Sequence, residues 1–191
     1  MVGQPEIYVS TDIEADGPFP GPHSMLSLAS VAMWPDETVV SEFSVNLQEL
    51  PETQPHPVTT KWWAEFPEAY AEARRDPEPP ETALPRYAEW IESLPARAVF
   101  VAYPVAWDFG WVYSYLLRFA GRCPFGHSGL DVKTLAMAAL ERPFRDSTKN
   151  QFPAEWCETE GLRAHVALDD ARQQGVMFCR ILKALRQRQN R

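Results

Sequence analysis

The stretch Ile7–Glu14, which reads IYVSTDIE, decides the fold because a short apolar run in it ends in two acids. The run predicts a buried strand over residues 7–11. Side chains two residues apart point to the same face of a strand, so the carboxylates of Asp12 and Glu14 would project together into one site. Two acids at the end of a buried strand serve little structural purpose without a cation. The alternative is an ordinary strand-to-loop transition, where acids are common.

Three further side chains, Asp108, His165 and Asp170, lie in sequence contexts that suit the same cation-binding site. Carboxylates gathered at one point repel each other unless cations lie between them. Two Mg²⁺ or Mn²⁺ ions about 4 Å apart are the usual reason to build such a cluster, and they serve phosphodiester cleavage. For Asp108 the alternative role is that of a helix cap.

The spacing of His165 and Asp170 restricts the secondary structure that they can adopt. They are five residues apart, which is about 140° around a helix, so they could not share a target if both were helical. We therefore expect His165 in a loop and Asp170 in the first turn of the next helix. Imidazole suits the role of general base, because it titrates near neutrality. The other histidines, His23, His56 and His127, are expected to be solvated at the surface.

The rest of the chain predicts strands and helices in alternation. We expect a hairpin over residues 24–33 and 38–45, helices over 60–74 and 81–93, a strand over 98–102, a helix over 107–119, a strand end and a helix within 130–140, an irregular segment over 142–151 and a last helix over 169–187. This order predicts an α/β fold, a mixed sheet of about five strands with helices on both faces. The proline clusters join regions of similar composition, so residues 1–191 are interpreted as a single domain.

The composition restricts the cellular compartment and the nucleic-acid partners that we expect. The net charge of −8 argues against a long non-specific grip on duplex nucleic acid, but it is compatible with an enzyme that holds only the last few nucleotides of a strand. The three cysteines are widely spaced and indicate neither a disulfide framework nor a zinc site. No leader segment and no apolar run near the ~20 residues of a membrane span is present, so we expect a cytoplasmic protein.

The order and spacing of these residues resemble the DEDDh branch of the 3′-5′ exonuclease superfamily, which includes ribonuclease T, proofreading exonucleases and oligoribonuclease. The first motif is the D-x-E of Asp12 and Glu14, and the third, H-x-A-L-x-D-A, is intact over residues 165–171. The second is commonly A-H-N-x-x-F-D and reads AYPVAWD over residues 102–108. The T-x-x-W-W stretch over residues 59–63 is similar to a phage- and actinobacterial-type subgroup.

The resemblance implies an RNase H-like fold and a 3′-5′ exonuclease that releases nucleoside 5′-monophosphates from single-stranded RNA or DNA, with RNA slightly preferred. It implies two Mg²⁺ (or Mn²⁺) ions, one held by Asp12, Glu14 and Asp170 and the other by Asp12 with Asp108. It also implies that His165 takes a proton from the attacking water. Two alternatives stay open, a DNA repair or proofreading-type exonuclease and a catalytically inactive nucleic-acid-binding or adaptor domain on the same fold.

Further expectations concern substrate contacts and assembly. The candidate substrate-binding residues are Pro18, Phe19, Met25, Trp62, Trp63 and Tyr103. Seven Trp, ten Phe and six Tyr in 191 residues exceed what one small core is expected to bury, and surplus aromatics mark interfaces. The resemblance to ribonuclease T and oligoribonuclease, which are homodimers, also implies a homodimer. Three other acids are interpreted as lying outside the site: Asp16, Asp131, which caps a helix, and Asp169.

Overall fold

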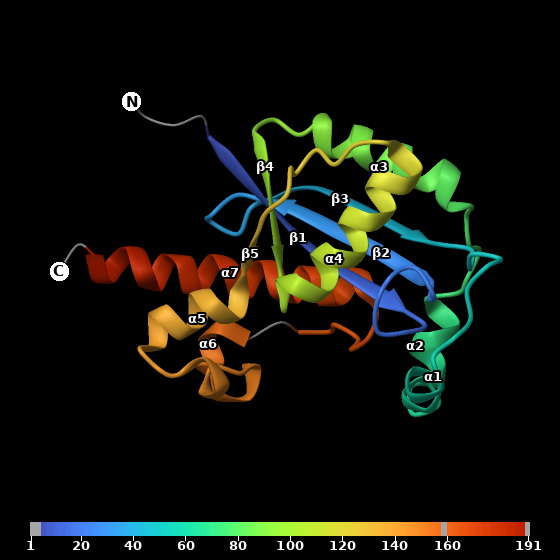
Figure 1. The fold of residues 1–191 in the computed structure, drawn as a ribbon. Helices are drawn as coiled ribbons and strands as arrows, with labels where there is room; N and C mark the ends of the chain where they lie inside the picture. The colour runs from blue at the N-terminus through green and yellow to red at the C-terminus, as the bar shows by residue number, and fades with distance from the viewer. Residues whose placement is uncertain (1–4, 158–159, 190–191) are drawn as a thin grey trace.

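A computed structural model describes residues 5–157 and 160–189. Its centre is a five-stranded sheet with the order β3-β2-β1-β4-β5 (Figure 1). The strands are β1 (Glu6–Ala15), β2 (Met25–Met33), β3 (Val39–Asn46), β4 (Arg97–Ala102) and β5 (Gly129–Asp131). The pairs β1–β2 and β2–β3 are antiparallel, whereas β1–β4 and β4–β5 are parallel. The expected mixed α/β sheet is confirmed.

Helices cover both faces of this sheet, as the sequence predicts (Figure 1). They are α1 (Pro57–Trp63), α2 (Pro67–Glu72), α3 (Pro80–Glu92), α4 (Val105–Tyr115), α5 (Val132–Leu140), α6 (Ala154–Cys157) and α7 (Ala167–Gln189). One core joins α3 and α4 to the sheet face that carries Ile13 and Leu28. A second core joins α5, α6 and α7 to the opposite face, which carries Tyr8 and Val31. Strands β1 and β2 are buried almost throughout because each lies between two helical layers.

Three elements differ from the prediction. Strand β1 continues to Ala15, so Asp12 and Glu14 lie within the strand, paired with β2, rather than just after it. The helix expected over residues 60–74 is two helices, because Pro67 starts α2 and disfavours helical backbone at the residue before it. Residues 142–151 contain two short 3₁₀ turns, Phe144–Asp146 and Lys149–Gln151, instead of being wholly irregular.

The aromatic side chains are mostly inside the fold. Trp63 and Trp111 are 3% and 1% exposed, and Trp90 is partly buried with its Nε1 donating to Ser41 Oγ at 2.8 Å. The aromatic surplus that predicts a homodimer is therefore largely absorbed by the two cores of one chain. Of the helices in the described ranges, none combines the length and the apolar character needed to cross a bilayer.

Candidate active site

The two acids of β1 face helix α7 across a close contact. Gly175 of α7 packs so near the sheet that an added Cβ would lie 2.4 Å from Met33 Cε and 3.1 Å from Ser10 Cβ. A larger residue would force the Met33 side chain to move and would crowd Ser10. This approach lets Gln174 Nε2 donate a hydrogen bond to Asp12 Oδ1 at 2.7 Å. The start of α7 therefore lies over the C-terminal half of β1.

Asp108 reaches the same place from helix α4. Strands β1 and β4 are parallel, so the chain leaves β4 at the sheet edge toward which β1 runs. Asp108 lies in the first turn of α4, is 2% exposed, and its Oδ1 accepts the backbone N–H of Ile13 at 3.2 Å. The N-cap of α4 is Pro104, so the cap interpretation of Asp108 is wrong. Its carboxylate is instead held against β1.

His165 and Asp170 have the local structure that their shared site requires. His165 lies in the turn before α7, and Asp170 lies in the first turn of that helix. Asp170 Oδ2 accepts the backbone N–H of His165 at 2.8 Å. Ligand atoms of Glu14, His165 and Asp170 all lie within 4.8 Å of one another. Glu14 thus converges on one point with two residues that lie more than 150 positions later in the chain.

The imidazole of His165 packs against two aromatic rings, Trp62 and Phe66, which also contact each other. The centroid of its ring lies 4.7 Å from that of Trp62 and 4.3 Å from that of Phe66. The backbone of His165 has φ of +61°, a left-handed conformation that is uncommon outside glycine. Such strain persists only where the surroundings over-determine it, and it often marks functional sites. Here the strained backbone of His165 is held by the hydrogen bond to Asp170 and by packing of the imidazole against the two rings.

Burial and mutual repulsion shift the acids of the cluster toward their protonated forms. Burial raises the pKa of Glu14 to about 8, with further contributions from the charges of Asp170 and Asp108. Burial also raises the pKa of Asp108 to about 8, against the lowering effect of its bond from Ile13. The pKa of Asp12 is raised well above its usual value by burial and then by the charge of Asp108. Four acids held this close are costly as anions without a compensating charge.

The donor set fits divalent cations that prefer oxygen. Asp12, Asp108 and Asp170 each have one oxygen engaged by an N–H donor within the described ranges, which fixes the direction of the carboxylate. Hard carboxylate oxygens are the ligands of Mg²⁺ and Mn²⁺, and cations between the acids would remove the repulsion that raises their pKa values. The cluster therefore has the chemistry of a divalent-metal centre.

We expect the metal-free protein to lose stability as the pH rises. Burial raises the pKa of Glu14 and of Asp108 to about 8, so between about pH 4 and pH 8 the folded chain binds more protons than the unfolded chain. Unfolding temperatures measured without metal should fall across this window. The loss is on the order of a few kcal/mol, at ~1.4 kcal/mol for each pKa unit. Addition of Mg²⁺ near pH 7 should release protons and restore the unfolding temperature.

A variant isolates the contribution of the cluster to this pH dependence. Glu14→Gln lacks one of the titrating groups, so its unfolding temperature should fall less steeply with pH. A metal-free unfolding temperature that is level from pH 5 to pH 8.5 in the wild-type chain would contradict the account.

The predicted substrate-binding residues divide into buried and accessible ones. Met25 is fully buried, and Trp63 is buried with its Nε1 donating to Ala15 O at 2.9 Å, so neither side chain can touch a substrate. Those two expectations are wrong because both side chains are used in packing. Phe19 is 56% and Trp62 36% exposed, and Tyr103 is partly exposed. Pro18 is exposed beside Phe19.

The acids interpreted as lying outside the cluster have structural partners. Asp131 caps α5 by accepting the Thr134 N–H at 2.6 Å, as expected. Asp16 accepts the N–H of Ser24 at 2.7 Å. Among the histidines, His23 differs from the expectation, because it is buried and its Nδ1 lies 2.7 Å from Gln54 O.

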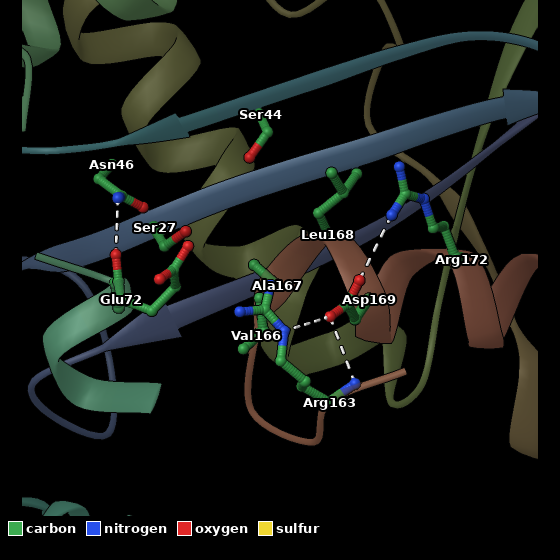
Figure 2. A pocket seen from close by; sticks show the side chains of 11 residues that line it. Ser27, Ser44, Asn46, Glu72, Arg163, Val166, Ala167, Leu168, Asp169 and Arg172 are labelled. Carbon is green, nitrogen blue, oxygen red and sulfur yellow. Dashed lines mark hydrogen bonds and ion pairs between the residues drawn. The ribbon is translucent and has the colours of Figure 1, made fainter. Parts of the chain in front are cut away.

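Asp169 lies in a separate pocket beside the cluster. Figure 2 shows this pocket of about 150 Å³, where Arg163 Nε donates to Asp169 Oδ2 at 3.0 Å and Arg172 Nη1 to Asp169 Oδ1 at 3.3 Å. Its lining comes from β2, β3, α2 and the start of α7 (Figure 2). Two guanidinium groups neutralise Asp169, which explains why it differs chemically from the adjacent Asp170.

Two functional candidates have no clear signal in the sequence. Gln174 holds Asp12, and its position one helical turn after Asp170 is the only pattern that could have pointed to it. Lys149 lies in the segment expected to be irregular, yet its charge lowers the pKa of Asp12, Asp108 and Asp170. Nothing in the local sequence distinguishes Lys149 from a solvated loop lysine.

Comparison with known proteins identifies a relative over nearly the whole chain. No established protein-family profile matches the sequence. The 3′-5′ DNA exonuclease Cap18 of Escherichia coli is similar at 29% identity over 177 residues, which are 91% of this chain and 90% of Cap18.

Solved structures share the fold at low identity. The nuclease domain of 3′hExo, a DEDDh family member bound to rAMP, matches with a TM-score of 0.70 at 12% identity over 93% of this chain and 92% of that domain. E. coli exonuclease I in complex with a dT13 oligonucleotide matches with a TM-score of 0.72 at 16% identity over 97% of this chain and 43% of its own. The Mg²⁺- and Mn²⁺-bound Pop2p of S. pombe matches with a TM-score of 0.65 at 12% identity over 91% and 82%. The expected RNase H-like fold is confirmed.

Proposed function

We propose that this chain is a DEDDh-type 3′-5′ exonuclease that removes nucleoside 5′-monophosphates from the 3′ end of a single strand. The observation that carries the proposal is the convergence of Glu14, His165 and Asp170 within 4.8 Å, beside Asp12 and Asp108. Carboxylates that can hold hard cations and an imidazole that can act as a base are the groups that a metal-dependent hydrolase needs in one site.

Asp12, Glu14, Asp108 and Asp170 would hold two divalent cations, Mg²⁺ or Mn²⁺. When bound, such ions stabilise the charge that develops on the attacking and leaving oxygens of a phosphodiester. In Pop2p, which has the same fold, both Mg²⁺ and Mn²⁺ are bound. Gln174 supports this role by keeping the carboxylate of Asp12 in one orientation.

His165 would act as the general base that takes the proton of the attacking water. Asp170 fixes the turn that carries His165 through the backbone N–H, and the rings of Trp62 and Phe66 restrict the imidazole. The products are a nucleoside 5′-monophosphate and a strand shortened by one nucleotide with a 3′ hydroxyl. The exposed faces of Phe19 and Trp62 are candidate surfaces for base stacking.

Single-stranded DNA is the substrate that the comparisons favour. Cap18 is a DNA exonuclease, and exonuclease I was solved with a dT13 oligonucleotide. The slight preference for RNA from sequence motifs has less support, since 3′hExo, which was solved with rAMP, is only 12% identical. With a net charge of −8 the chain is expected to grip only a few nucleotides and to bind duplex weakly. The homodimer stays a prediction.

A side-by-side digestion tests the proposed function. Oligonucleotides of single-stranded DNA, single-stranded RNA and duplex with a 3′ overhang, each labelled at the 5′ end, would be incubated with Mg²⁺, with Mn²⁺ and with excess EDTA. We expect ladders shortened one nucleotide at a time from the 3′ end of the DNA, and no products in EDTA. Cleavage that survives exhaustive EDTA treatment would exclude the metal mechanism.

The alternative of an inactive nucleic-acid-binding or adaptor domain predicts a different result in the same assay. Such a domain would bind the single strand without shortening it in either metal. The presence of all five motif residues in one place argues against this alternative. A homologue that has lost its activity usually lacks at least one metal-binding residue.

A further inference from the structure

Lys149 lies between helices α5 and α6 in the chain and contacts helix α7 close to the acid cluster. Its backbone N–H donates to the hydroxyl of Tyr103 at 3.3 Å, and its Nζ lies 5.2 Å from the centroid of the Tyr103 ring. The same Nζ lies 3.5 Å from Gln173 Oε1, one helical turn after Asp170. Tyr103 and α7 thus hold both the backbone and the ammonium group of Lys149 beside the cluster.

The ammonium group of Lys149 forms no ion pair with a carboxylate of the described residues. None of the ion pairs within residues 5–157 and 160–189 involves Lys149, although ten arginine–carboxylate pairs are present in those ranges. Its polar contact with Gln173 is long for a hydrogen bond. Lys149 therefore has donors to offer to a ligand while it remains close to the cluster.

The charges of the complete site show which ligand would suit it. Two divalent cations would balance the four carboxylates and would leave the site nearly neutral before a substrate enters. A phosphodiester brings one negative charge, and Lys149 brings one positive charge. Lysine serves as a point charge that binds phosphate oxygens in many sites.

We propose that Lys149 binds a non-bridging oxygen of the scissile phosphate and that Tyr103 positions it through the hydroxyl that accepts its backbone N–H. This inference rests on the proposed exonuclease function and adds a substrate ligand to it. It also gives a role to Tyr103, which stands where the family motif commonly has histidine. Lys149 would contact the substrate in both the ground state and the product, because the phosphate stays on the released nucleotide.

The test compares Lys149→Gln with a matched control. Lys133→Gln removes the same charge from the neighbouring helix α5, where Nζ lies 4.2 Å from the Phe144 ring centroid. In Mg²⁺, Lys149→Gln is expected to lower kcat/KM on the preferred strand by roughly 10²-fold, whereas Lys133→Gln should be close to wild type. Lys149→Arg keeps the charge and should recover part of the loss.

Product binding separates a phosphate contact from a general effect on the acids. Calorimetry with dAMP and with deoxyadenosine, both in Mg²⁺, measures how much affinity the phosphate adds. We expect Lys149→Gln to weaken dAMP about tenfold and to leave deoxyadenosine unchanged. Tyr103→Phe should show a smaller loss of the same kind, and it should have no further effect in the Lys149→Gln background.

Each outcome decides a different statement. If the wild-type chain digests no strand, the proposed exonuclease function fails whatever Lys149 does. If the wild-type chain is active and Lys149→Gln matches Lys133→Gln, the role of Lys149 is wrong and the function stands. If Lys149→Gln changes Mg²⁺ affinity but not the phosphate contribution to dAMP binding, Lys149 is a counter-ion of the cluster and the proposal is wrong. Unfolding temperatures of all variants confirm that folded proteins are being compared.

Discussion

Asp12→Asn is expected to lower the rate of cleavage by roughly 10³-fold or more while raising the stability of the metal-free protein. The amide can still accept the hydrogen bond from Gln174, so the change removes the charge and leaves the local geometry. The charge is needed to hold the cations. Without cations the negative charge of Asp12 destabilises the folded protein, since burial and the neighbouring acids raise the pKa of Asp12 well above its usual value.

The two effects should be measured on the same samples. Initial rates on labelled single strands in Mg²⁺ give the loss of activity, and unfolding temperatures in EDTA near pH 8 give the gain in stability. Asp170→Asn should behave in the same way, because its amide oxygen can still accept the His165 N–H. Asp169→Asn, one residue earlier, is the matched control and should keep most of the activity, since Asp169 is paired with Arg163 and Arg172. Folded Asp12→Asn and Asp170→Asn proteins with near-normal rates would refute the metal assignment.

His165→Asn should reduce the rate by roughly 10²-fold near neutral pH, the typical contribution of a positioned general base. Metal affinity should change little if His165 serves as the base. The pH dependence of the rate should also change, because the group that accepts the proton of water is gone. His127→Asn is the control, as His127 is exposed in a loop outside the site.

Two results would contradict this role of His165. An unaltered pH–rate profile in His165→Asn would place the base elsewhere. A large loss of Mg²⁺ affinity would instead make His165 a metal ligand, which its position within 4.8 Å of Glu14 and Asp170 allows geometrically.

The local patterns that carry the site were readable in the chain alone. Alternation along a strand places Asp12 and Glu14 on one face, and the geometry of a helix start separates His165 from Asp170 in the way the site needs. These rules depend on neighbours a few residues away. The prediction of the alternating strands and helices rests on the same short-range periodicity, and it failed where a proline broke the helix expected over residues 60–74.

The sequence by itself thus determined the class of fold and pointed to the residues that the fold brings together. Only the tertiary structure decided what surrounds them. Three contacts join elements that are distant in the chain: the hydrogen bond from Gln174 to Asp12, the packing of Phe66 on His165, and the approach of Lys149 to the acids. The burial of Met25 and Trp63 depends likewise on which helix covers them. Such contacts depend on the closing of long loops and on the packing of whole faces, and no short-range pattern records them.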